Sequence, residues 1–170
     1  MNTIIRAYNS ADIPSMINIW NEVVEEGVAF PQEDYLTQAT GQVFFNEQTH
    51  CGVAEEQNSK KILGLYILHP NNVGRCGHIC NASYAVSSES RGLGIGKKLV
   101  KDSLVQGKHY DFTILQFNAV VATNSFARQL YERLGFVQLG VIPVGFRMKD
   151  GHYEDICPYY YLLKRKWLEL

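Results

Sequence analysis

The chain has 170 residues, of which 46% are hydrophobic and 19% are charged, and its formal net charge is −1. This length predicts a single domain over residues 1–170 with a hydrophobic core of its own. The composition excludes an intrinsically disordered chain. The nearly balanced charge also argues against a dedicated nucleic-acid binder, because such proteins carry a clear basic excess.

The small net charge hides an asymmetry along the chain. Residues 1–59 contain nine acidic side chains and one basic side chain, whereas residues 60–170 contain fifteen basic and eight acidic ones. An asymmetry between the two halves of a chain is a hint about the charge of its partners. We therefore expect an acidic region in the first half and a basic region in the second.

The N-terminal sequence lacks the pattern of a secretory signal, because Met1–Arg6 leads into polar residues rather than an apolar stretch. The longest apolar run, around residues 62–68, is far shorter than the ~20 residues of a membrane span. We expect a cytoplasmic protein that binds no membrane, and its four cysteines should be free thiols.

One short segment could be read as a metal site. Cys76, His78 and Cys80 bring three candidate ligands into five residues, and on a strand they would share one face. No second ligand pair follows at zinc-finger spacing. We therefore expect no metal site and interpret these cysteines as buried or half-buried thiols.

Hydrophobic periodicity predicts alternating strands and helices in the first half of the chain. Apolar residues at helical spacing from Ile13 to Val24 predict a helix, with Ser10 or Asp12 as its N-cap and Gly27 as its end. The expected elements are a strand over 3–7, this helix, a second helix over about 36–47, and strands over 51–55 and 62–69.

The second half continues the alternation. Lysines on one face and apolar residues on the other identify residues 95–109 as an amphipathic helix. Gly135 is a natural end for a helix over 124–134. The remaining expected elements are strands over 78–86, 114–121, 137–144 and 153–163.

A glycine-rich turn, Arg91-Gly-Leu-Gly-Ile-Gly-Lys-Lys98, precedes the helix over 95–109. Glycines let backbone N–H groups approach an anion, and a helix N-terminus adds unpaired donors and a positive dipole end. We interpret the turn as a phosphate or pyrophosphate site. Its spacing excludes a P-loop, which needs Gly at 91 and Ser or Thr at 98, and a dinucleotide fingerprint, which needs Gly at 97.

Two blocks of the sequence resemble the GCN5-related N-acetyltransferase (GNAT) family. Arg91-x-x-Gly94-x-Gly96 is similar to the acetyl-CoA pyrophosphate motif of that family, and Asn124–Phe136 matches its second block. Ser88 departs from the family pattern, which often has Pro there. The resemblance covers nearly the whole chain. It implies an α/β (α+β) fold: a mixed, mostly antiparallel sheet of about seven strands, splayed at strands 4 and 5 and flanked by about four helices.

The resemblance also implies which residues bind acetyl-CoA, the co-substrate. The backbone of Tyr84, Ala85 and Val86 would receive the pantetheine arm, and Asn124 would bond the same arm. The residues expected around the pyrophosphate are Arg91, Gly92, Leu93, Gly94, Ile95, Gly96 and Lys97.

The catalytic residues implied by the resemblance are Tyr131, Asn81 and Asn118. Tyr131 matches a family tyrosine near the thioester sulfur, where a phenol can protonate the departing thiolate; the alternative is a core aromatic. Many relatives use a carboxylate to remove the amine proton. Here Asn81 and Asn118 can orient the amine but cannot act as bases. The sequence pattern around Asn81 and Asn118 resembles the subgroup that contains the fungal azetidine-2-carboxylate (proline-analogue) acetyltransferases. The alternative is that the two asparagines satisfy polar backbone groups at the splayed strand pair.

The expected function is transfer of an acetyl group from acetyl-CoA to the amine of a small molecule by direct attack. The amine would belong to an amino acid, an amino-acid analogue or a polyamine-like compound. We expect Phe30, Tyr35 and Asn81 to line the acceptor site, and Arg147 or Arg75 could hold an acceptor carboxylate. Five nearby acids form either an acidic mouth for a cationic amine or a solvated helix face: Glu22, Glu25, Glu26, Glu33 and Asp34.

Three alternatives stay open. Cys80 could form an acyl-enzyme, although strand alternation directs it away from Asn81. The chain could instead be a CoA-binding regulatory or protein-interaction module, or it could acetylate proteins or peptides. Because family members are often dimers, a homodimer is also an expectation.

Overall fold

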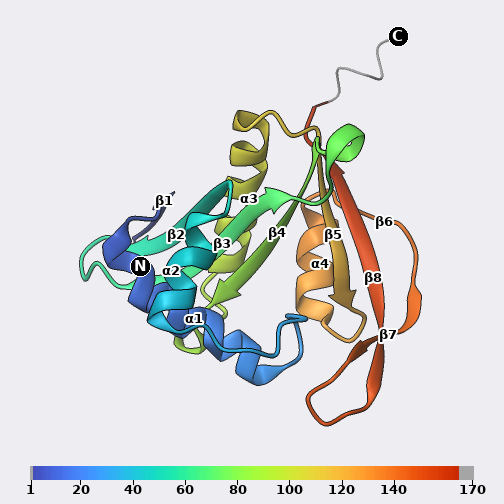
Figure 1. The fold of residues 1–170 in the computed structure, drawn as a ribbon, viewed down its shortest axis with the longest axis horizontal. Helices are drawn as coiled ribbons and strands as arrows, with labels where there is room; N and C mark the ends of the chain where they lie inside the picture. Colours follow the sequence, from blue (N-terminus) through green and yellow to red (C-terminus); the bar gives the residue numbers. More distant parts are fainter. Residues whose placement is uncertain (1, 165–170) are drawn as a thin grey trace.

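A mixed sheet of eight strands separates two pairs of helices in the computed structural model, which describes residues 2–164 (Figure 1). The strands are β1 Thr3–Ala7, β2 His50–Glu56, β3 Ile62–Pro70, β4 Ile79–Val86, β5 Ile114–Val121, β6 Val137–Gln138, β7 Ile142–Arg147 and β8 Tyr153–Leu162. The helices are α1 Ile13–Glu26, α2 Gln38–Asn46, α3 Ile95–His109 and α4 Ser125–Arg133. The predicted α/β class is therefore confirmed, and the helices over 95–109 and 124–134 form nearly as predicted.

The two faces of the sheet follow from the alternation of side chains along its strands. On β3, Leu65 and Ile67 belong to the core cluster beneath α1 and α2, whereas Tyr66 and Leu68 belong to the cluster beneath α3. Each face thus buries its own helix pair, because successive residues of a strand point to opposite sides. This explains why β3 reads as an almost continuous apolar run.

The sheet opens between β4 and β5. The strand order is β1-β2-β3-β4-β5-β8-β6, with β7 also paired to β8. All pairs are antiparallel except β4 with β5, which run parallel and pair only through Ile79 with Ile114 and Cys80 with Leu115. Beyond these residues the two strands diverge, as Figure 1 shows. The splay leaves main-chain groups of both strands without a strand partner.

The sequence prediction was wrong at the C-terminal edge of the sheet. Residues 137–144 do not form one strand but divide into β6 and the start of β7, which gives eight strands rather than about seven. Pro143 has no N–H to donate, and Val144 takes a positive φ of 50°. The register against β8 shifts between Ile142 and Phe146 as a result.

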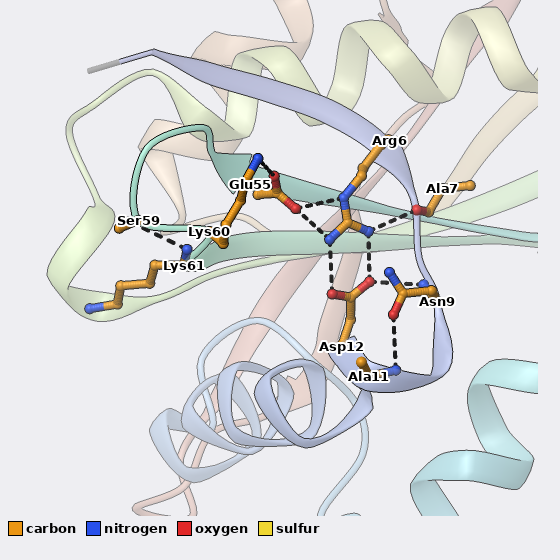
Figure 2. Close-up of polar contacts among 9 residues, drawn as sticks. All are labelled: Arg6, Ala7, Asn9, Ala11, Asp12, Glu55, Ser59, Lys60 and Lys61. Carbon is orange, nitrogen blue, oxygen red and sulfur yellow. Dashed lines mark hydrogen bonds and ion pairs between the residues drawn. The ribbon is translucent and has the colours of Figure 1, made fainter.

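Helix α1 begins without the side-chain cap that was predicted. Asp12 occupies the N-cap position, but its carboxylate makes no capping hydrogen bond to the first turn. It instead binds the Arg6 guanidinium, with Nη1 and Nη2 at 2.7 and 2.9 Å (Figure 2). Arg6 Nε also donates to Glu55 at 2.7 Å, so this cluster joins β1, α1 and β2. The other end is as predicted, because Gly27 ends α1 with a φ of 62°.

No helix among residues 2–164 is long and apolar enough to cross a membrane.

Candidate active site

A cleft of about 1140 Å³ follows the splay between β4 and β5. Its walls come from α1, the loop between α1 and α2, the glycine turn and α4, together with the two strands themselves. Tyr131, Asn81 and Asn118 all line this cleft, as do Tyr84, Val86 and Asn124. The structure therefore brings these predicted site residues together from β4, β5 and the region of α4.

One end of the cleft is the glycine turn at the start of α3. Gly92 and Gly94 have φ values of 77° and 75°, and apart from each glycine and its two chain neighbours no atom lies within 4 Å of the place where a Cβ would stand. The turn thus presents bare backbone to open space, and the first turn of α3 adds N–H groups without helical partners. Arg91 and Lys97 supply positive charge beside it. Leu93, by contrast, is exposed and does not line the cleft.

The pairing of β4 decides which of its amides face the splay. Ser87 N–H donates to Leu63 O, and Asn71 N–H donates to Ile79 O, so the odd-numbered residues of β4 bond to β3. The N–H groups of Tyr84 and Val86 consequently point toward the splay. Ala85 bonds toward β3 and buries its methyl group on the α1 side.

Tyr131 presents its phenol to the cleft from α4. Its ring packs on Phe117 of β5, with centroids 4.4 Å apart, and on Phe136 at 5.5 Å. Burial raises the pKa of Tyr131 well above that of a free phenol, so the hydroxyl stays protonated at neutral pH. No other described residue forms a hydrogen bond with this hydroxyl, which leaves it available to a ligand.

The other end of the cleft carries a cluster of side-chain amides. Asn118 Nδ2 donates to Asn71 Oδ1 at 2.7 Å, and Asn81 Nδ2 donates to the same oxygen at 3.3 Å. Asn71 Nδ2 returns a bond to Asn118 Oδ1 at 3.2 Å, which Gln116 Nε2 also approaches at 3.0 Å. Asn71 thus bridges the two strands across the splay. Sequence reasoning missed Asn71, since it lies just past β3 in a segment that read as a loop.

Apolar side chains wall the cleft around these amides. Phe30, Val28 and Met148 are among them. Phe30 lies 4.3 Å from Trp20 by ring centroids and is buried against α1. Tyr35 is 54% exposed and lies outside the cleft lining, as do Arg75 and Arg147. The arginine and lysine side chains that do line the cleft, among the described residues, are Arg91, Lys97 and Arg133.

The acids of the first half are joined to groups of the second half. Glu26 pairs with Arg91 at 2.7 Å, and Glu33 pairs with Arg147 at 2.5 Å. Glu25 pairs with Lys149, and a Glu22 oxygen accepts the Ser88 N–H at 2.8 Å. Four of the five acids expected at an acidic mouth are thus engaged within the protein. Much of the acidic excess of the first half is therefore used in ion pairs and hydrogen bonds with the second half of the chain.

These features agree with the comparison to known proteins. The model of the acetyltransferase (GNAT) family matches residues 13–136. The chain belongs to the GNAT family. N-acetyltransferase aca1 of Schizosaccharomyces pombe is 31% identical over 156 residues, which are 83% of this chain and 74% of that protein. An uncharacterized N-acetyltransferase of Methanocaldococcus jannaschii is 29% identical, over 96% of this chain and 92% of its own length.

Solved structures show the same fold. A GNAT from Kribbella flavida superposes with a TM-score of 0.87 at 27% identity, covering 94% of this chain and 97% of its own. The protein yncA from Salmonella typhimurium, whose structure holds acetyl-CoA, gives a TM-score of 0.88 at 18% identity, with 97% and 96% covered. This GNAT is accordingly an acyl-CoA-dependent acetyltransferase.

The cleft fits acetyl-CoA on its own geometry. The bare glycine turn and the α3 N-terminus suit a pyrophosphate, and the splayed edge of β4 offers N–H groups to an extended amide-bearing chain. Asn124 lines the cleft while its Oδ1 accepts the Ala127 N–H at 3.2 Å, which fixes the start of α4. Its Nδ2 has no hydrogen-bond partner among the described residues.

The cysteines of this GNAT do not form an active centre. Cys80 is fully buried, donates to Ile114 O at 3.3 Å, and has a pKa raised by burial to about 12, so it is not a thiolate at neutral pH. Cys76 lies exposed in a short turn before β4 rather than on the strand. Within the described residues, no three His, Cys, Asp or Glu side chains are gathered as a metal ion would need.

Proposed function

We propose that this GNAT transfers the acetyl group of acetyl-CoA directly to the amine of a small molecule. The observation that carries the proposal is the meeting of two chemical groups on the cleft: the free phenol of Tyr131 and the amide cluster around Asn81 and Asn118. One is a proton donor and the other orients hydrogen-bonding ligands. The splay of β4 and β5 lies between them.

Acetyl-CoA supplies the acetyl group as a thioester when bound. The Val86 N–H points into the splay and can donate to the thioester oxygen as negative charge develops there. Asn81 and Asn118 hold the attacking nitrogen, since their amides both donate and accept hydrogen bonds. Tyr131 stays protonated and can give its proton to the leaving sulfur.

The walls of the acceptor end support a small acceptor. The loop after α1 and the hairpin of β7 and β8 both reach the cleft, through Phe30 and Met148. They are joined by the Glu33–Arg147 and Glu25–Lys149 pairs. Gly27 also touches Lys149, where a Cβ would stand 2.8 Å from that side chain. These contacts hold the two segments together beside the acceptor end, which favours a small acceptor over a folded protein.

The amides also bear on the kind of small molecule. An amino acid or amino-acid analogue remains our proposal, together with polyamine-like amines. Because Arg75 and Arg147 do not line the cleft, an acceptor carboxylate would be bound by the amide N–H groups of Asn81 and Asn118. The proline-analogue subgroup suggested by the Asn81 and Asn118 pattern belongs to this class of acceptors.

The test is release of free thiol from acetyl-CoA over a panel of amines. The panel contains amino acids, cyclic imino acids and their analogues, polyamines, and short peptides with free N-termini. We expect turnover with one class of small amine. Turnover with peptides alone would instead identify a protein acetyltransferase, and acetyl-CoA binding without turnover would identify a CoA-binding module.

A further inference from the structure

We propose that His69 is the general base that removes the proton from the attacking amine. This inference rests on the proposed function, which assigns no residue to take up the amine proton. Asparagines cannot take up a proton near neutral pH, and the central strands offer no carboxylate on the cleft. The chain therefore needs another acceptor for the proton that the amine loses.

The sheet places His69 directly beside the amide cluster. His69 on β3 is the cross-strand partner of Asn81 on β4. Since the odd-numbered residues of β4 form the hydrogen-bonded pairs with β3, the two Cα atoms are about 5.5 Å apart and their side chains share one face. His69 also lines the cleft. Of the five histidines in the chain, it is the only one that does.

One hydrogen bond fixes the tautomer of His69. Its Nδ1 lies 3.0 Å from the carbonyl oxygen of Pro70. A carbonyl oxygen only accepts, so Nδ1 must carry the hydrogen when this bond forms. In the neutral ring Nε2 is then the unprotonated nitrogen. No described residue donates to Nε2, so its lone pair is left for a ligand in the cleft.

The other titratable groups on the cleft do not compete for this role. They are Glu26, Tyr84, Arg91, Lys97, Tyr131 and Arg133. Glu26, the one carboxylate in this set, is paired with Arg91 at 2.7 Å. Tyr84 donates to Ser103, which in turn donates to Val100 O at 2.8 Å, and burial raises the pKa of both cleft tyrosines. The three remaining groups are arginine and lysine side chains, which donate hydrogen bonds and do not accept them.

The proton balance of the transfer then closes with two residues. The neutral amine nitrogen forms a bond to the acetyl carbon and gives one proton to His69 Nε2. The carbon–sulfur bond breaks, and the sulfur takes a proton from Tyr131. His69 ends as imidazolium and Tyr131 as phenolate, and proton exchange with solvent returns both to their starting states.

The decisive variant is His69→Gln, with His78→Gln as the matched control. His78 is exposed and lies outside the cleft lining. We expect His69→Gln to lower kcat/KM for the amine by about 10²-fold, with an unchanged Kd for acetyl-CoA. His78→Gln should match the wild type. A calorimetric titration with acetyl-CoA and a thermal unfolding curve establish that each variant is folded.

The slope of the pH profile separates a base from a merely structural residue. At acidic pH, log kcat/KM of the wild type should rise with a slope of two, because both the imidazole and the amine must lose a proton. In His69→Gln the slope should be one, since only the amine titrates. A His69→Gly variant should also regain activity when free imidazole is added, which tests the same point if His69→Gln is poorly folded.

The outcomes distinguish this inference from the proposed function. A His69→Gln variant with the rate and slope of the wild type, or a His69→Gly variant that imidazole does not rescue, would overturn the role of His69 while acetyl transfer stands. A wild-type protein that acetylates no amine would overturn both.

Discussion

The ring of Tyr131 packs against Phe117 with centroids 4.4 Å apart and an interplanar angle of 41°, so apolar contacts hold the phenol at the cleft. Replacing Tyr131 by Phe keeps this packing and removes only the hydroxyl. We expect Tyr131→Phe to lower kcat by about 10²-fold through loss of the proton donor and to leave acetyl-CoA affinity within twofold. Steady-state kinetics and a binding titration measure the two quantities separately. Tyr153→Phe is the control, because Tyr153 is 59% exposed and outside the cleft lining. Equal rates for Tyr131→Phe and the wild type would contradict the assigned role.

The environment of Tyr131 also predicts how kcat depends on pH in the alkaline range. Burial raises the pKa of Tyr131 above the usual value for a phenol, so the proton that it donates stays in place through the alkaline range. We expect no decrease of kcat from Tyr131 ionisation up to about pH 10. A decrease that begins near pH 8 and disappears in Tyr131→Phe would show that the phenol ionises more readily than this site allows.

The amide cluster predicts that Asn71 affects catalysis by positioning Asn81 and Asn118, although it does not itself react. Its side chain bonds to both Asn81 and Asn118, at 3.3 and 2.7 Å. We expect Asn71→Ala to raise KM for the amine and to lower kcat, because the two other amides lose their common partner. The double variant Asn71→Ala with Asn118→Ala should cost less than the sum of the single variants, since the residues share one network. A double-mutant cycle on kcat/KM checks this, and strict additivity would argue against the network.

The glycine turn predicts a selective effect on acetyl-CoA. Gly94 has a φ of 75° and faces open space. An alanine there costs about 1–2 kcal/mol in backbone strain, and its methyl group would occupy the space left for the pyrophosphate. We expect Gly94→Ala to raise KM for acetyl-CoA at least tenfold. Gly74→Ala is a matched control, because Gly74 also has a positive φ of 56° with nothing within 4 Å, yet lies outside the cleft lining. It should lose similar stability and keep its KM; similar KM increases in both variants would show that strain alone is responsible.

The Arg6 cluster predicts sensitivity to acid. Arg6 lowers the pKa of Asp12 below its usual range through their hydrogen bonds. The stabilisation from this pair is therefore present above the unfolded-state pKa of Asp12, near 3.9, and is lost as the pH falls through the lower folded-state value. We expect Arg6→Met to destabilise the protein by about 1–3 kcal/mol at pH 7, because it leaves the buried Asp12 carboxylate without its cation. Its unfolding midpoint should also depend less on pH below 4.

An exposed ion pair, Lys61 with Glu89, provides the control for Arg6→Met. Lys61 pairs with Glu89 at 2.7 Å, but both side chains are more than half exposed. Lys61→Met should leave the unfolding midpoint unchanged, because exposed pairs contribute little. If chemical denaturation gave Arg6→Met the same stability as Lys61→Met, the cluster in Figure 2 would be a surface feature rather than a tie between β1, α1 and β2.

The sequence by itself determined the family and most of the order of elements, and it predicted the residues of the acetyl-CoA end of the site. These depend on local features: the glycines before α3, the helical spacing of Ile13–Val24 and the block Asn124–Phe136 can each be read within a few residues. The strands 137–144 and 153–163 were harder, because the break at Pro143 and Val144 depends on pairing with β8. Local propensity does not specify such register shifts.

Only the tertiary structure decided the acceptor end. Asn71 and His69 lie near the end of β3, and nothing in their local sequence sets them apart from other polar residues. His69 lines the cleft because the β3–β4 register places it opposite Asn81, and Asn71 joins the amide cluster because it reaches across the splay to Asn118 of β5. The pairing of Glu26 with Arg91 likewise joins two residues that lie on either side of β2, β3 and β4 in the sequence. Sequence patterns report local periodicity, whereas a site assembled across strands depends on register and on where two strands part.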